Sequence, residues 1–510
     1  MNINIKDYKS KVRGCWLGKN IGGTLGAPFE SKRGLFEVTY YTHDITKGVL
    51  PNDDLDLQLV WLNAAEKYGT EVDAKILASY WQTFITAHWS EYGASKSNMK
   101  MGLMPPLSGW HHNAFRDSNG AFIRTEIWAC LMPGNPQQAV KYAYEDAITD
   151  HSYEGVYGAA FCAAIQSAAF VENDLFKLID IGLSYIPEDC GVAKGIKTVL
   201  ECYEKKMDYK ECRKAVMNSV PGSFGSFIGY EERPVEDDIP NGPDGYDAPS
   251  NVALAILGLV YGEGSFDKTI CIAVNCGEDA DCTAATAGAL FGIMYGDGFF
   301  DKKWTDPIGE EIKTISIDMT DEYAVKVPTT IGELTERVVK LMPTFMRKDI
   351  SFEGNEMQII PQKNLYNETV DVRKRPGEYL EIKYNFYQVL DKQPYSIQYK
   401  FPLFNVDVHY EDGGVIYPRG SKKITLSFAK VLTRQQWISA KWHTDEGVHV
   451  DVKKKSTFLE YIPDDSGYGA KMEFVVSIDE TAETKTVSVI ELRSNLSGEV
   501  MCIPVALVCE

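Results

Sequence analysis

The sequence predicts an all-α domain followed by a β-sandwich domain, because the spacing of apolar residues changes along the chain. From Tyr8 to about Met342, apolar residues recur at helical spacing in stretches rich in Ala, Gly and Leu. From about Ile350 onward, apolar and polar residues alternate, which is typical of half-buried strands. At 510 residues, the chain is long enough for two or three domains with substantial cores.

The helical domain is expected to span residues 1–345. Its high density of small residues lets helices approach closely, which favours a helical globule. A long segment rich in Gly, Pro and Asp, residues 221–250, interrupts the helical pattern and is interpreted as an ordered loop over a site. The helices predicted from apolar spacing cover residues 57–65, 137–147, 155–169, 252–261 and 284–296.

The C-terminal part is expected to consist of a linker, residues 346–360, and an immunoglobulin-like β-sandwich, residues 361–510. Clusters of Gly and Asp separate its alternating segments, as expected for short strands joined by turns. The predicted strands cover residues 401–409, 423–428, 448–453, 473–478 and 486–492.

Charge and composition exclude some classes of partner. A net charge of -20 argues against nonspecific binding to nucleic acid or to an anionic membrane. No uncharged run reaches the roughly 18 apolar residues that a membrane span needs, and the N-terminus lacks the pattern of a secretory signal. The 11 scattered cysteines indicate reduced thiols, so we expect a cytoplasmic protein. The oligomeric state stays open.

Two acidic segments each precede an apolar, helix-like stretch. They are Asn52-Asp53-Asp54-Leu55-Asp56 and Gly277-Glu278-Asp279-Ala280-Asp281-Cys282-Thr283. Carboxylates against a buried helix are costly unless a cation or dense hydrogen bonding neutralises them. Oxygen ligands of this kind favour Mg²⁺, Mn²⁺ or Ca²⁺ over zinc. The two segments together therefore predict a shared cation site.

A second interpretation of the same segments involves no metal. Asp and Asn are favoured at helix N-termini, where they cap free N–H groups and interact with the helix dipole. Asp279 and Asp281 would point to different sides of a regular helix, but they share a face in an extended segment just before one. The metal interpretation is favoured because both segments precede strongly apolar helices.

Five motifs resemble the ADP-ribosylglycohydrolase family. They cover residues 13–30, 52–54, 119–124, 147–158 and 277–288, and they follow the order of the family over residues 8–340. The resemblance implies an all-α fold that holds two Mg²⁺ ions, or Mn²⁺ in some members. It also implies hydrolysis of a glycosidic bond at the anomeric carbon of ADP-ribose.

The resemblance assigns metal ligands residue by residue. It makes Asp53, Asp54, Asp279 and Asp281 ligands of the ions. Asn52 stands where many members have Thr or Ser, and its amide oxygen can still coordinate a hard ion.

Cys282 is a second departure, since many members have a hydroxyl residue there. A thiol is a poor ligand for Mg²⁺. Either Thr283 replaces it as a ligand, or water fills the position, or one of the two metal sites is weakened.

The resemblance also places Glu30 near the attacking water, so that Glu30 or a metal-bound carboxylate such as Asp54 acts as the base. Glu30 has an alternative interpretation as a solvated residue beside Lys32 and Arg33.

A glycine loop is implied to receive the diphosphate, since glycine lets backbone N–H groups approach an anion. Two of the residues concerned have alternative interpretations. Arg124 could form an ion pair with Asp146 or Glu126, and His151 could cap a helix. The residues implied to contact the substrate are Asn119, Gly120, Arg124 and His151.

These observations lead to one functional hypothesis and two alternatives. The first is a metal-dependent glycohydrolase acting on a small-molecule or ADP-ribosylated substrate. The second keeps hydrolysis but changes the substrate to another N- or O-glycoside, such as a nucleoside or sugar conjugate. The third is a catalytically silent binding or structural protein on the same fold, which the Cys282 departure motivates.

Overall fold

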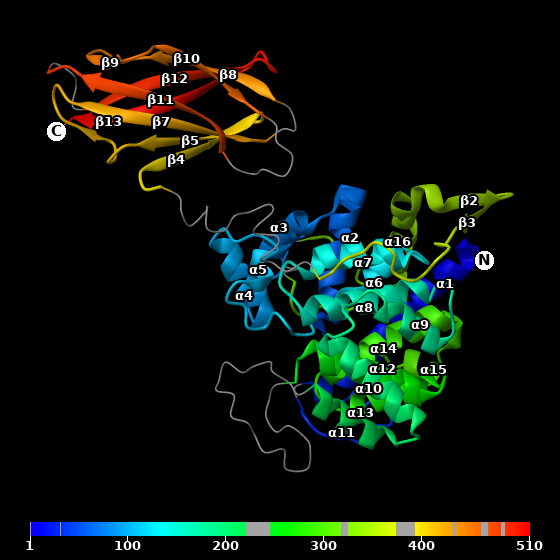
Figure 1. The fold of residues 1–510 in the computed structure, drawn as a ribbon. Coiled ribbons are helices and arrows are strands. Elements are labelled where there is room, and N and C mark those ends of the chain that lie inside the picture. Colours follow the sequence, from blue (N-terminus) through cyan, green and yellow to red (C-terminus); the bar gives the residue numbers. More distant parts are fainter. Residues whose placement is uncertain are drawn as a thin grey trace. The chain divides into compact units, whose positions relative to one another are not determined.

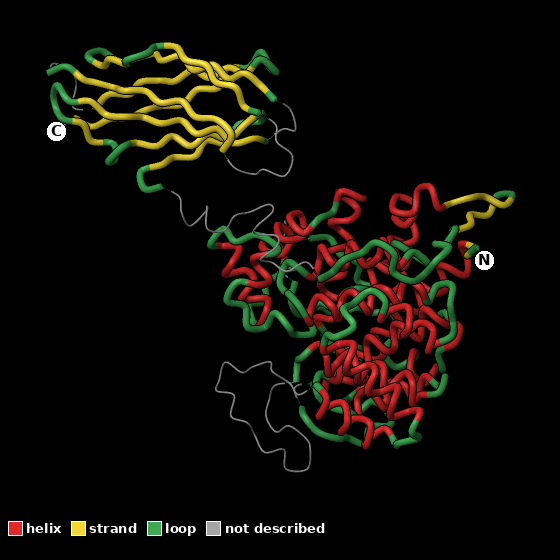
Figure 2. The backbone as a smooth tube through the Cα atoms, in the orientation of Figure 1, coloured by secondary structure: helices red, strands yellow, loops and turns green. Residues whose placement is uncertain are grey.

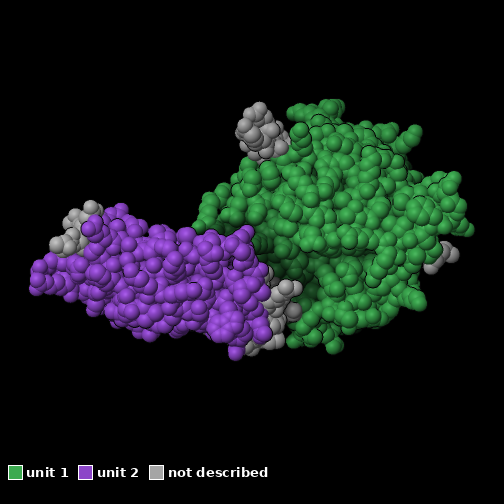
Figure 3. Space-filling view, turned by 90° about the horizontal axis from the view of Figure 1, so that it is seen from above, with its two compact units in different colours: residues 1–376 green, residues 377–510 purple. Residues whose placement is uncertain are grey.

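The computed structural model describes residues 2–30, 32–220, 245–317, 325–373, 393–431, 435–460, 468–480 and 485–509. The chain divides into two compact units, Met1–Pro376 and Gly377–Glu510 (Figure 3). The first is helical and the second is built of strands, which confirms the predicted fold class (Figure 2). No helix among the described residues is both long and apolar enough to cross a membrane.

The helical unit contains the helices labelled in Figure 1, together with short 3-10 turns. The predicted helical segments all lie within observed helices, give or take one residue at an end. The helices are α1 (Ile5–Gly26), α2 (Asp53–Tyr68), α3 (Ala74–Phe84), α4 (Ser90–Lys100), α5 (Leu107–Trp110), α6 (Glu126–Leu131), α7 (Pro136–Ala147), α8 (Glu154–Ala168), α9 (Leu175–Leu183), α10 (Gly191–Glu204), α11 (Tyr209–Ser219), α12 (Ala248–Gly262), α13 (Phe266–Asn275), α14 (Ala280–Tyr295), α15 (Lys302–Thr305) and α16 (Ile331–Met346). The 3-10 turns are η1 (Ala27–Phe29), η2 (Ile45–Lys47), η3 (Gly69–Glu71), η4 (Phe122–Arg124), η7 (Asp297–Phe299) and η8 (Arg347–Asp349).

Helices α1 and α14 touch backbone to backbone at the centre of this unit. A Cβ atom at Gly18 would lie 2.0 Å from the Gly288 carbonyl oxygen, and one at Gly22 would lie 2.2 Å from that of Ala284. The glycines recur every four residues and so form one face of α1. Partner numbers fall as α1 proceeds, so the helices are antiparallel. The end of α1 therefore meets the start of α14, which joins the first motif to the second acidic segment.

The predicted linker is wrong, because residues 346–360 are part of the helical unit. Strands β2 (Ile350–Glu353) and β3 (Glu356–Ile359) form a hairpin, and β3 also pairs with β1 (Ile3–Asn4) near the N-terminus. The partner of β3 lies more than 350 residues away in the sequence, so local alternation could not reveal that this hairpin belongs to the helical unit.

Residues 361–373, which were assigned to the sandwich, also pack on the helical unit. The Gln362 N–H donates to the Gly134 carbonyl at 2.8 Å, and the Asn367 N–H donates to Ser184 Oγ at 3.0 Å. The first strand of the second unit begins only at Ser396. The boundary therefore lies near residue 376.

The second unit is formed by two five-stranded sheets (Figure 1). One has the order β10-β8-β12-β13-β6 and the other β4-β5-β7-β11-β9. The strands are β4 (Ser396–Lys400), β5 (Phe404–Tyr410), β6 (Val415–Ile416), β7 (Ser421–Lys430), β8 (Gln436–His443), β9 (Val448–Val450), β10 (Lys454–Leu459), β11 (Tyr468–Ile478), β12 (Lys485–Ser494) and β13 (Val500–Cys509).

The two sheets share one hydrophobic core. Burial alternates along the strands, as β12 and β13 show, and the inward residues of both sheets join a single cluster that includes Phe428 and Trp442. This arrangement is that of a β-sandwich. Its immunoglobulin-like character stays a prediction.

Candidate functional site

The two acidic segments differ in how they start their helices. Asn52 caps α2, since its Oδ1 accepts the Asp54 N–H at 2.7 Å. Asp279 occupies the corresponding position before α14, but its side chain caps no N–H group there. Helix capping therefore explains Asn52 and does not explain Asp279.

Both segments meet at one cavity of about 320 Å³. Its lining includes residues that the sequence predicted and others, from the start of α4, that it did not. Asp54 is not in the lining and lies beside it, 2% exposed. The predicted site residues in the lining are Glu30, Asn52, Asp53, Asn119, Gly120, Asp279 and Asp281. Cys282 and Tyr246 come from the second acidic segment and the predicted loop, and the unpredicted residues include Trp89, Glu91 and Tyr92.

Neutral donors orient the carboxylates. The Tyr92 hydroxyl donates to Asp53 Oδ2 at 2.9 Å, and the Asn52 amide donates to Asp281 Oδ2 at 3.0 Å. The Asn119 amide donates to Asp279 Oδ2. Each of these carboxylates is thus fixed at one oxygen by a group that brings no positive charge.

Three oxygens of this group have no hydrogen-bond partner among the described residues, although they are buried. They are Asp54 Oδ2, Asp279 Oδ1 and Asp281 Oδ1. Burial raises the pKa of Asp279 to about 7 and raises the pKa values of Asp54 and Asp281 well above the usual range. Unpartnered buried carboxylate oxygens fit a hard cation, so these residues could hold a metal ion.

Glu30, which directly follows the 3-10 turn η1 after α1, completes the acidic group. Carboxylate oxygens of Glu30, Asp279 and Asp281 lie within 4.8 Å of one another. The charge of Asp281 and then partial burial raise the pKa of Glu30 to about 8. Glu30 is an exposed residue, as its alternative interpretation expects, and the neighbouring Arg33 binds Glu278 at 2.9 Å.

Cys282 contributes a hydrogen-bond donor. Its thiol donates to Asp54 Oδ1 at 3.2 Å, and burial followed by the nearby carboxylates raises its pKa, so the proton stays on sulfur. Thr283, proposed as its replacement, is fully buried and donates to the Ala280 carbonyl of its own helix at 3.2 Å. Cys282 lines the cavity, whereas Thr283 does not.

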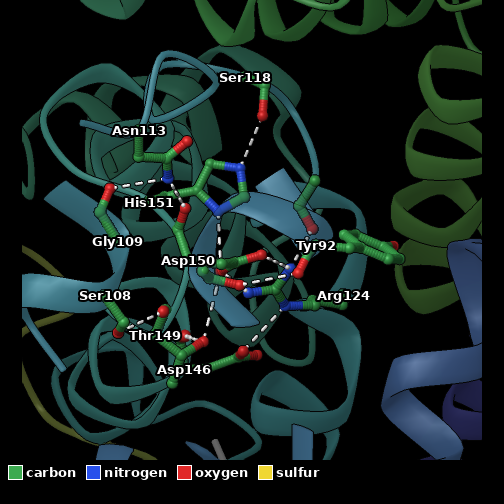
Figure 4. Close-up of polar contacts among 12 residues, drawn as sticks. Tyr92, Ser108, Gly109, Asn113, Ser118, Arg124, Asp146, Thr149, Asp150 and His151 are labelled. Atoms are coloured by element: carbon green, nitrogen blue, oxygen red, sulfur yellow. Dashed lines mark hydrogen bonds and ion pairs between the residues drawn. The ribbon is translucent and has the colours of Figure 1, made fainter. Parts of the chain in front are cut away.

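Arg124 lies in a separate buried network (Figure 4). Its Nε donates to Asp146 Oδ1 at 2.8 Å, its Nη1 donates to the Gly120 carbonyl at 2.7 Å, and its Nη2 donates to Asp150 Oδ1 at 2.5 Å. The side chain is fully buried and outside the cavity lining. The guanidinium thus binds the carbonyl of the glycine loop and does not face the cavity. Its ion pair with Asp146 is the one that the alternative interpretation expected.

His151 belongs to the same network. Its Nε2 lies 2.9 Å from Ser118 Oγ and its Nδ1 lies 2.8 Å from Asp150 Oδ1 (Figure 4). Like Arg124, the ring is fully buried and is not part of the cavity lining.

Sequence reasoning missed the contribution of α4. Trp89, Glu91 and Tyr92 reach the cavity from the start of this helix. The available signal was a carboxylate flanked by aromatic residues at a helix start, which is too common to be assigned a role without the fold. Of the long loop predicted over the site, residues 221–244 lie outside the described residues, and Tyr246 lines the cavity.

Comparisons with known proteins give a family. Among solved structures, a 9% identical match to the GAE domain of GGA2p from Saccharomyces cerevisiae covers 22% of this chain and 96% of that chain, but its TM-score of 0.17 is too low to bear on the fold. No curated protein sequence matches the chain. Residues 4–342, which include both acidic segments and the glycine loop, match the model of the ADP-ribosylglycohydrolase family. The chain therefore belongs to the ADP-ribosylglycohydrolase family.

Proposed function

We propose that the protein is a metal-dependent hydrolase that cleaves a glycosidic bond at the ribose anomeric carbon of an ADP-ribosylated substrate. The observation that carries the proposal is the set of three unpartnered, buried carboxylate oxygens beside a cavity in a chain of this family. A glycosyl hydrolase of this kind needs a positioned water, a base and a means of holding the ribose.

Asp53, Asp54, Asp279 and Asp281 would hold Mg²⁺ or Mn²⁺, with two ions as the family resemblance implies. Such an ion would supply Lewis acidity and a template for water and ribose hydroxyls. Asn52 is better suited to orienting Asp281 than to coordination, because its amide nitrogen faces that carboxylate and its oxygen caps α2.

Glu30 would accept the proton of the attacking water. Its carboxylate lies at the cavity beside Asp281, and the negative charges of Asp281 and Asp53 keep its pKa high. Any positive charge held by those aspartates lowers the pKa of Glu30 and makes it a base near neutral pH. Glu30 can therefore act as a base near neutral pH only when the neighbouring aspartates hold a cation.

Arg124 and His151 receive a positioning role in place of the predicted contact with the diphosphate. Both are buried, and Arg124 grips the Gly120 carbonyl while Asn119 holds Asp279. The loop that carries Asn119 and Gly120 would thus be kept in register with the acidic group, and its backbone would face the substrate.

One observation favours the alternative substrate class, a nucleoside or sugar conjugate without a diphosphate. No Lys or Arg occurs among the described residues that line the cavity. A diphosphate would therefore depend on backbone N–H groups and bound cations alone. The cavity volume also lies near the lower end of the roughly 300–1,000 Å³ range of ligand pockets.

The proposal is tested with the full chain by two measurements. Calorimetry measures Mg²⁺ binding, and product analysis measures release of ADP-ribose from ADP-ribosylated peptides and of the base from a nucleoside. We expect the double variant Asp279→Asn, Asp281→Asn to lose both binding and turnover. The matched control is Asp174→Asn, an exposed helix cap of α9 that should behave as wild type. Unchanged Mg²⁺ binding by the double variant would refute the metal assignment.

A further inference from the structure

We infer that Glu91 is a catalytic residue that donates a proton to the leaving group of the substrate. The inference deepens the proposed function and rests on it. Glycoside hydrolysis uses two carboxyl groups on opposite sides of the scissile bond, one for the water and one for the leaving atom. Glu30 serves the water, and the proposed function leaves the second role unassigned.

Glu91 is placed at the cavity by the glycine loop. It lies in the first turn of α4 and is 6% exposed, and it is one of the cavity-lining residues. A Cβ atom at Gly120 would lie 2.1 Å from Glu91 Oε1, so a larger residue there would displace the carboxyl group. The carboxyl group of Glu91 thus requires a glycine at position 120, whether or not the loop binds an anion.

The glycine loop separates Glu91 from the metal-binding candidates. Asn119 donates to Asp279 on one side, and Gly120 lies against Glu91 on the other. The charges that act most on Glu91 are His151, Asp150 and Arg124, all of the buried network. Glu91 and the acidic group therefore line one cavity, and each contacts one of two consecutive loop residues.

The surroundings of Glu91 suit a proton donor. Burial is the main cause that raises its pKa, and the charge of Asp150 adds to it, whereas His151 and Arg124 act in the opposite direction. Tyr92, the neighbouring ionisable residue on α4, is itself buried with a raised pKa and stays neutral. A raised pKa lets a carboxyl group hold its proton to higher pH, which favours its use as a general acid.

A cation site at Glu91, Asp150 and His151 is a weaker interpretation, although their ligand atoms lie within 4.8 Å of one another. Asp150 already receives two hydrogen bonds from Arg124, at 2.5 and 3.1 Å. The His151 ring is held between Ser118 and Asp150. Only Glu91 of the three lines the cavity.

The chemical step balances with water as the only co-reactant. The bond between the anomeric carbon and the leaving atom breaks, and its electron pair moves to the leaving atom, which takes the proton of Glu91. Water forms the new bond to the anomeric carbon and gives its proton to Glu30. Proton exchange with solvent then restores both carboxyl groups.

The test compares leaving groups in Glu91→Gln. Two ADP-ribosides are used, one with a simple alcohol and one with 4-nitrophenol as leaving group. A general acid contributes about 10²–10⁴-fold, mainly where the leaving group needs a proton. We expect a loss of this size in kcat for the alcohol, a loss below about tenfold for nitrophenol, and disappearance of the basic limb of the pH profile.

Two controls separate this role from a structural one. Glu211→Gln, in the first turn of α11, should match wild type on both ribosides. Glu91→Gln should bind Mg²⁺ with unchanged affinity, and Glu91→Asp should recover part of the turnover. Equal losses on the two ribosides, or no loss, would overturn the assignment of Glu91. Turnover of neither riboside by wild-type protein would overturn the proposed function, and the inference with it.

Discussion

Two of the buried groups of charged residues in the helical unit differ in how their charge is balanced. The network around Arg124 pairs two carboxylates with a guanidinium. Asp146 accepts hydrogen bonds from Arg124 and Trp128, and Asp150 accepts from Arg124 with His151 Nδ1 2.8 Å away. In the part of the chain that the structure describes, the side-chain hydrogen bonds to Asp279 and Asp281 come from the neutral amides of Asn119 and Asn52.

The pKa values of the aspartates differ between the two groups. Burial favours the neutral form of Asp150, but Arg124 and His151 outweigh it and lower its pKa to about 2. In the same network, burial raises the pKa of Asp146 to about 6 in spite of Arg124. Burial raises the pKa of Asp279 to about 7. A balanced buried charge serves the fold, whereas an unbalanced one marks a place where a ligand must supply the missing charge.

The largest expected effect tests the balanced network. Arg124→Met leaves Asp146 and Asp150 buried without their cation, and breaking a buried pair in this way costs about 3–5 kcal/mol. Urea unfolding measures the loss of free energy. The matched control Arg337→Met removes the partly exposed pair with Glu66, for which we expect about 0–1 kcal/mol. A small effect of Arg124→Met would contradict the view that this network supports the fold.

In the acidic group, we expect removal of a charge to stabilise the fold instead of destabilising it. The pKa of Asp281 is raised in the folded state. Such a carboxyl group stabilises the folded state fully at pH values below its unfolded-state pKa, and this contribution is lost as pH rises through its folded-state pKa. Without a cation, Asp281→Asn should therefore melt at a higher temperature than wild type at pH 8. Saturating Mg²⁺ should reverse the order, since ligand at 100 times Kd stabilises wild type by about 2.7 kcal/mol. A variant that melts lower in both conditions would show that Asp281 serves the fold.

Protons should compete with the cation for the acidic group. Asp279 has a pKa of about 7, so below pH 7 a proton must leave before a cation binds. The Kd for Mg²⁺ should rise as pH falls from 8 to 6, by up to about tenfold per pH unit for each proton displaced. Calorimetry in two buffers of different ionisation enthalpy measures both Kd and proton release. A Kd independent of pH would place the cation elsewhere.

The smallest expected effect concerns Cys282. The thiol already donates to Asp54, and Cys282→Ser keeps a donor there while adding a hard oxygen. We expect the Kd for Mg²⁺ to decrease by less than about tenfold, or 1.4 kcal/mol. Cys276→Ser, at another buried cysteine outside the cavity lining, controls for the change of atom. A large loss of affinity in Cys282→Ser would assign the sulfur a direct role.

Much of the fold followed from periodicity, because a helix face and a strand face repeat at different intervals. That signal predicted α2, α7, α8, α12 and α14, together with the strands of the sandwich. It misplaced the boundary between the units because alternation identifies a strand but not its partner. The hairpin at Ile350–Glu353 and Glu356–Ile359 looks like the sandwich in sequence and pairs with the N-terminus in space.

The sequence predicted those site residues that stand in short segments with a recognisable pattern. Two acidic segments, each before an apolar helix, indicated carboxylates that need a counter-charge, and the cavity brings both segments together. Arg124 and Glu91 show the limit of that reasoning. The family resemblance implied that Arg124 contacts an anion, yet Arg124 binds Asp146 and Asp150 instead. Glu91, to which the sequence analysis gave no role, lines the cavity.

The sequence by itself determined the two fold classes, the family and the acidic residues, because these depend on residue type and spacing. Only the tertiary structure decided which buried charges are balanced. That decision depends on which side chains from distant segments come within a few ångströms. The glycine face of α1 illustrates it, since backbone contact with α14 places the end of one helix beside the start of the other and brings Glu30 to Asp281.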